Sequence, residues 1–218
     1  MMPFLLPPSY RQEVIDGWTV QVGEEEFSDP SWQAVKNELN NQLYRIGRVV
    51  PDGPLANLRK ITIWVHKDDA ATKCMAYHPG AQWLKEHGSD SQMVHGIEIA
   101  NAQNFISWTY EQPWMVLHEL SHGYHDQFLT GGFENPAVKQ VWDAEMKSKR
   151  YDRVLHYDGN TVKHYAETNQ MEFFSECTEA YFGQNDFYPF VNAELKAFDP
   201  DAFQLMQSVW GTPQKRSR

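Results

Sequence analysis

The sequence predicts a single-domain α+β fold with a small mixed β-sheet and a mainly helical C-terminal part. Strand-like segments precede a central helix and mostly helices follow it, without the regular strand–helix alternation of a βαβ protein. The 218 residues, 41% of them apolar and 22% charged, can bury a substantial core without disulfide bonds. We expect one domain over residues 1–218, with residues 1–12 and 213–218 as loose ends.

A strand and a helix are expected in the first quarter of the chain. Residues 18–22 alternate between apolar and polar side chains, which predicts a strand, and the acidic run 24–26 follows it as a turn. Asp29 is a suitable helix cap, and Pro30 suits the first helical position. Apolar residues then recur at steps of three and four, which predicts a helix to about residue 47.

Strands and loops are expected between this helix and the central helix. Proline and glycine indicate a loop at residues 51–54, and β-branched residues predict a strand at residues 61–65. Residues 66–93 are interpreted mainly as loop, whereas residues 94–100 alternate weakly and form a further candidate strand. Pro113 then suits the start of the central helix.

Composition excludes some classes of function and leaves the compartment open. Lys and Arg number 19 and Asp and Glu number 29, and the net charge of −10 argues against a nucleic-acid binder. No apolar run reaches the roughly 18 residues of a membrane-spanning helix. The first residues lack the basic segment of a signal peptide, so a mature secreted bacterial protein and a cytoplasmic protein both stay open. Cys74 and Cys177 fit either one disulfide or two thiols.

The central helix carries the motif His-Glu-Leu-Ser-His over residues 118–122. His118 and His122 lie one turn apart on the same helix face, so two imidazoles can reach one tetrahedral Zn²⁺ ion. Glu119 lies further round the helix and suits a general base for a metal-activated water. His125 follows on the histidine face, where we expect it to support the ligand residues or to pack in the core.

A third zinc ligand is expected from a later helix. The pattern that continues with glycine and a third histidine fails here, because His125 and Phe128 occupy those positions. Glu172 is the alternative, since a second acidic residue, Glu176, follows it one turn later. We therefore expect Glu172 to bind zinc and Glu176 to accept a hydrogen bond from the free ring N–H of a ligand histidine. A solvated acidic helix face is the other interpretation, and the two phenylalanines between these glutamates argue against it.

These two segments together resemble the gluzincin metallopeptidases, including the catalytic domain of anthrax lethal factor and similar bacterial proteins. The resemblance covers residues 113–182 and is carried by residues 118–122, the Glu-Phe-Phe-Ser-Glu run at 172–176, and Tyr165 seven residues before Glu172. It implies a zincin-like fold with one Zn²⁺ ion per chain and the ligands and base already given. It also implies that Tyr165 donates a hydrogen bond to the transition state.

The expected activity is zinc-dependent hydrolysis of a peptide bond. A metal-activated water would attack the carbonyl, Glu119 would transfer its proton, and zinc and a phenol would hold the oxyanion. Tyr165 fits the phenol because it precedes the helix of Glu172, and Tyr151 and Tyr157 are competitors in the same stretch. The alternative is a non-catalytic, zinc-stabilised binding protein, which would need no base beside its metal.

A peptide or protein substrate is the expected partner, with no nucleic acid and no membrane. The edge strand beside the active helix of a zincin pairs with an extended substrate, and residues 94–100 are the candidate for that strand. Trp83 and Trp108 are expected in loops, where they could line pockets near the cleft.

Overall fold

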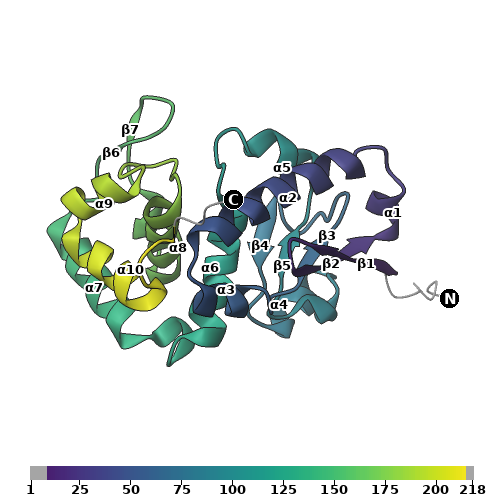
Figure 1. Cartoon of the computed structure of the whole chain (residues 1–218), viewed down its shortest axis with the longest axis horizontal. Coiled ribbons are helices and arrows are strands. Elements are labelled where there is room, and N and C mark those ends of the chain that lie inside the picture. The colour runs from purple at the N-terminus through teal and green to yellow at the C-terminus, as the bar shows by residue number, and fades with distance from the viewer. Residues whose placement is uncertain (1–8, 215–218) are drawn as a thin grey trace.

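The computed structural model describes residues 9–214 and divides into a sheet half and a helical half that meet at helix α6 (Figure 1). The elements of the sheet half are, in chain order, β1 (Tyr10–Ile15), β2 (Trp18–Gly23), α1 (Glu24–Phe27), α2 (Trp32–Val49), α3 (Asp52–Leu58), β3 (Ile63–Val65), β4 (Met75–Tyr77), α4 (Ala81–Glu86), η1 (Ser91–Met93), β5 (Ile97–Ile99) and α5 (Ala102–Trp108). Then follow α6 (Met115–Phe128), η2 (Gly132–Glu134), α7 (Pro136–Ser148), β6 (Val154–Leu155), β7 (Thr161–Val162), η3 (Tyr165–Glu167), α8 (Gln170–Phe182), α9 (Asn192–Phe198) and α10 (Pro200–Trp210). The mixed α+β class expected from the sequence is confirmed.

The five-stranded sheet has the order β1-β2-β3-β5-β4. Strands β2, β3 and β5 run parallel to one another, and β1 and β4 pair antiparallel at the two edges. Strand β5 therefore lies inside the sheet, and the expectation that residues 94–100 form its edge is wrong. The physical reason is that residues 75–77, expected in a loop, fold back along β5 and take the edge position.

Other segments expected to be irregular are also regular. Residues 10–12 belong to β1, which pairs with β2 over its whole length and is no loose end. The acidic run forms the short helix α1. Residues 52–58 form α3, and Pro54 is compatible with it because it lies in the first turn, where a missing backbone N–H costs no intrahelical hydrogen bond. The long segment 66–93 contains β4, α4 and η1.

The expected chain ends fall partly outside the described residues. Residues 1–8 and 215–218 lie outside them. Residues 213 and 214 are described, and the backbone N–H of Gln214 donates a hydrogen bond to the carbonyl of Val49 at 2.8 Å. This part of the chain therefore contacts α2.

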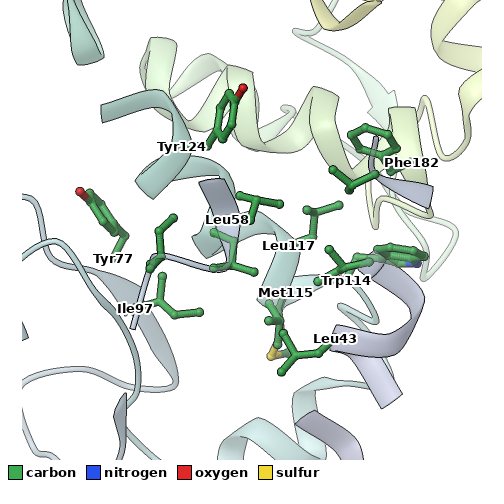
Figure 2. Close-up of a cluster of buried hydrophobic side chains, with 14 of the residues drawn as sticks. Leu43, Leu58, Tyr77, Ile97, Trp114, Met115, Leu117, Tyr124 and Phe182 are labelled. Carbon is green, nitrogen blue, oxygen red and sulfur yellow. The ribbon is translucent and has the colours of Figure 1, made fainter. Parts of the chain in front are cut away.

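Helix α6 is the central element because the core surrounds it. Figure 2 shows its side chains Met115 and Leu117 among residues of α2, α3, β5 and α8. A Cβ at Gly123 would lie 2.7 Å from Cδ1 of Ile61, closer than real side chains pack, so glycine lets α6 approach this part of the core. Core residues of both halves therefore pack against α6 and hold it in place.

Three smaller expectations have outcomes in the described part of the chain. Cys74 and Cys177 are both buried and free, so no disulfide joins them. Trp83 and Trp108 lie in α4 and at the end of α5 rather than in loops. No helix among residues 9–214 combines the length and apolar character needed to cross a membrane.

Candidate metal centre

Helices α6 and α8 bring His118, His122 and Glu172 together. The two histidines lie one turn apart on α6. Glu172 lies in the first turn of α8, where the side chain of Asn169 caps the helix by accepting from the backbone N–H groups of Met171 and Glu172. This cap fixes the start of α8 and therefore the position of Glu172 against α6.

The three potential ligand atoms form a compact triangle. Nε2 of His118 lies 3.0 Å from Oε2 of Glu172 and 3.2 Å from Nε2 of His122. Nε2 of His122 lies 3.3 Å from the same Glu172 oxygen. Ligand atoms about 2.0–2.1 Å from a tetrahedral metal ion are about 3.3 Å apart. The chemistry and spacing of this donor set therefore fit Zn²⁺ with its fourth position left open.

The outer nitrogen of each histidine is held by α8. Nδ1 of His118 donates to Oε1 of Glu179 at 2.7 Å, and Nδ1 of His122 lies 3.2 Å from Oγ of Ser175. Such contacts set the ring orientation and leave Nε2 facing the centre, as is usual for metal-binding histidines.

Glu176 does not make the contact expected for it. Its nearest carboxylate oxygen lies 3.7 Å from Nδ1 of His118, whereas Glu179 lies at hydrogen-bond distance. Glu172 and Glu179 are seven residues apart, which is close to two full helical turns and places them on one face. The spacing of four residues therefore selected the wrong partner for His118, because which acidic residue of α8 reaches it depends on how α8 crosses α6. Ser175 was also missed, because serine at this position carries no sequence signal.

The centre is strongly acidic and largely buried. Burial lowers the pKa of His118, but its hydrogen bonds to Glu172 and Glu179 outweigh this and hold that pKa well above the usual value. Burial raises the pKa of Glu172, but hydrogen bonds from His118 and His122 bring it well below its usual range. Burial raises the pKa of Glu179 to about 7 and that of Glu176 well above its usual range. Carboxyl groups gathered in this way favour a bound cation.

A cleft of about 470 Å³ opens onto these ligand atoms. Glu119 lines it beside His118, without taking part in the triangle of ligand atoms. Tyr165, in η3, also lines the cleft and keeps 48% of its surface exposed. Burial and the nearby charge of Glu172 raise the pKa of Tyr165, which keeps its phenol protonated as a hydrogen-bond donor. The edge strand β4 forms one wall.

His125 is a packing residue and does not support the ligands. It is fully buried, and neither ring nitrogen has a hydrogen-bond partner. Its ring lies between Phe133 and Phe174, with centroids 5.3 and 4.8 Å away. Of the two roles expected for His125, packing in the core agrees with the structure, and support of the ligand residues does not.

Only some of the other aromatic residues considered for the site line the cleft. Trp108 lines the cleft, whereas Trp83 lies away from it and stacks on His78 and His87. Tyr151 is buried and donates to Asp199, and Tyr157 does not line the cleft. Of the three tyrosines considered for the oxyanion, Tyr165 alone lines the cleft.

Glu179→Gln is expected to weaken zinc binding by about 10–100-fold, because it removes the carboxylate that orients His118. Glu176→Gln is the matched control on the same helix, and we expect a clearly smaller loss. Competition for zinc against a chelator of known affinity measures both. Equal losses, or a larger loss for Glu176→Gln, would contradict the contact seen between Glu179 and His118.

His125→Leu is expected to make the metal-free protein less sensitive to acid. Burial lowers the pKa of His125 to about 4, from 6.5 in the unfolded chain. Between these values the unfolded chain binds the proton and the folded one does not, so stability falls as the pH drops. From pH 7.5 to 5.0 this residue should cost about 2 kcal/mol of unfolding free energy. Urea titrations at both pH values measure the difference, with the exposed His87→Leu as control. An unchanged pH dependence in His125→Leu would refute the assignment.

No family model matches the chain, and neither a curated protein nor a solved structure matches it.

Proposed function

We propose that this protein is a zinc-dependent peptidase in which His118, His122 and Glu172 bind one Zn²⁺ ion. The observation that carries the proposal is the triangle of ligand atoms, with sides of 3.0, 3.2 and 3.3 Å, open to a cleft. The contacts of both outer histidine nitrogens and the position of Glu119 in the cleft support it. A purely structural zinc site is usually closed by a fourth protein ligand.

The residues around the proposed zinc ion have distinct roles in the proposed reaction. Bound zinc supplies a Lewis acid and lowers the pKa of a water toward about 7. Glu119 takes the proton of the attacking water and delivers it to the nitrogen of the leaving amine. The phenol of Tyr165 donates a hydrogen bond to the carbonyl oxygen as negative charge develops on it. Glu179 and Ser175 hold the two imidazoles in place throughout.

The edge strand β4 is the proposed binding strand for the substrate. Its outer edge has no partner strand among residues 9–214, and residues 73–77 line the cleft. An extended peptide can add to such an edge through backbone hydrogen bonds. The side chains of Met75, Trp108, Phe133 and Met171 add apolar surface to the same cleft. We therefore propose a peptide or protein substrate bound in extended form along β4.

We further propose that the fold is of the zincin type. A mixed sheet ends in an antiparallel strand at the cleft, α6 carries the paired histidines, and a helix of the second half supplies the carboxylate. This agrees with the likeness to gluzincin metallopeptidases, which is an argument by analogy with their architecture.

Peptide hydrolysis by the zinc-loaded protein tests the proposal. A library of internally quenched peptides should show cleavage that stops on chelation and returns when Zn²⁺ is added back. Mass spectrometry of the products locates the cleaved bonds. A protein that binds zinc at these three residues and hydrolyses no peptide in the library would instead be a non-catalytic, zinc-stabilised binding protein.

A further inference from the structure

A second group of histidine and carboxylate side chains lies on the face of the sheet opposite α6. Ile97 and Ile99 of β5 point into the main core, so Glu98 between them points to the other face. His66 directly follows β3, and Asp69 lies in the segment after it. Potential ligand atoms of His66, Asp69 and Glu98 all lie within 4.8 Å of one another.

Glu98 is the buried centre of this group. Only 1% of its side chain is exposed, and its two oxygens lie 2.6 Å from Nδ1 of His66 and 2.7 Å from Nε2 of His78. Burial raises the pKa of Glu98, but the two imidazoles outweigh it and lower the pKa to about 2. The hydroxyl of Tyr10 lies 3.0 Å from Nε2 of His66 and fixes the ring from its outer side. A contact on the outer ring nitrogen would orient His66 for a metal ion on its Nδ1 side.

A cavity of about 290 Å³ lies against this group and is strongly acidic. His66 and Asp69 line it, together with the carboxyl groups of Glu25, Glu26, Asp68 and Asp90. Among the described residues Lys67 is its one lysine or arginine, and this lysine pairs with Asp29 at 2.9 Å. The cavity therefore has carboxylates in excess over cations.

One buried carboxylate oxygen beside this cavity has no hydrogen-bond partner. Glu26 is fully buried and lines the cavity, yet its Oε2 has no hydrogen-bond partner. Burial raises the pKa of Glu26 to about 7. Buried polar atoms normally have partners, and a divalent ion in the cavity would stabilise the ionised form of this carboxyl group.

We propose that His66, Asp69 and Glu98 bind a second Zn²⁺ ion on the far side of the sheet from the candidate metal centre. One imidazole and two carboxylates form a donor set that zinc accepts, and the cavity leaves room for water at the remaining position. The ion replaces the proton between His66 and Glu98, and the Nδ1 and Oε1 atoms, 2.6 Å apart in the metal-free protein, separate to about 3.3 Å to bind it. It links β3, β5 and the segment that leads to β4, so its role is structural.

This inference does not depend on the proposed peptidase activity, and zinc analysis separates the two. Zinc per chain is measured by plasma mass spectrometry after dialysis against buffer with Zn²⁺ and then against metal-free buffer. We expect about two ions in the wild type, about one in Asp69→Asn and about one in His122→Ala. Asp69→Asn keeps the side-chain shape, and Asp68→Asn, an exposed neighbour in the same cavity, is the matched control and should keep both ions.

Peptide hydrolysis by the same variants is a second measurement. Asp69→Asn should keep peptide hydrolysis, because the site that it removes lies across the sheet from the cleft. If the wild type binds one zinc ion and Asp69→Asn also binds one, the second site would be overturned. Equal zinc loss in Asp68→Asn and Asp69→Asn would overturn it too. Zinc that is lost in Asp69→Asn but not in His122→Ala would support the second site and contradict the candidate metal centre.

Discussion

Replacing Glu119 by glutamine is expected to lower kcat/KM for peptide hydrolysis by about 10²–10⁴-fold, the usual contribution of a general base. Glutamine has nearly the same shape, but it cannot take the proton of the attacking water. Because Glu119 is not among the three ligand residues, zinc content should stay at the wild-type value. Progress curves with a cleaved quenched peptide and zinc analysis on one sample measure both effects.

The control for this experiment is Glu134→Gln, which changes an exposed carboxyl group in η2. It should keep both activity and zinc. Hydrolysis by Glu119→Gln within a factor of a few of the wild-type rate would exclude Glu119 as the base. It would also remove the main argument for a catalytic rather than a structural zinc ion.

Replacing Glu172 by glutamine is expected to remove the zinc ion of the candidate metal centre and, with it, the activity. The neutral amide gives up the charged oxygen that lies 3.0 Å from His118 and 3.3 Å from His122. The loss of zinc affinity should exceed about 100-fold, since loss of an outer hydrogen-bond partner alone costs about 10–100-fold. Zinc titration against a competing chelator measures the affinity, and the quenched peptide measures the activity.

Asp201→Asn is the control for the loss of an acidic group in the first turn of a helix, because Asp201 is exposed at the start of α10. Circular dichroism should show folded protein for both variants. Wild-type zinc affinity in folded Glu172→Gln would mean that this glutamate is not a ligand.

Local geometry explains why part of the site could be predicted from the sequence. Two histidines four residues apart share a face of any helix, whatever surrounds it. Glu172 was predicted from the acidic residue that follows it one helical turn later, and the structure places Glu172 beside both histidines. The choice between Glu176 and Glu179 was not local, because it depends on how α8 crosses α6.

Strand pairing limited the prediction of the fold in the same way. The short strand at residues 75–77 has flanking proline and glycine and too few residues to show an alternating pattern. It becomes a strand because β5 offers it an edge, which is a contact between distant segments. His66 and His78 show no ligand spacing in the sequence for a similar reason. They follow the strands β3 and β4, and the residue that contacts both, Glu98, lies in β5.

The most direct test of the central claim is a crystal structure of the zinc-loaded protein with anomalous diffraction measured on both sides of the zinc absorption edge. The account predicts an anomalous peak about 2.0–2.2 Å from Nε2 of His118, Nε2 of His122 and a carboxylate oxygen of Glu172. It also predicts that Glu119 and Tyr165 face the open side of that peak. A zinc-loaded crystal with no peak between these three residues would contradict the account.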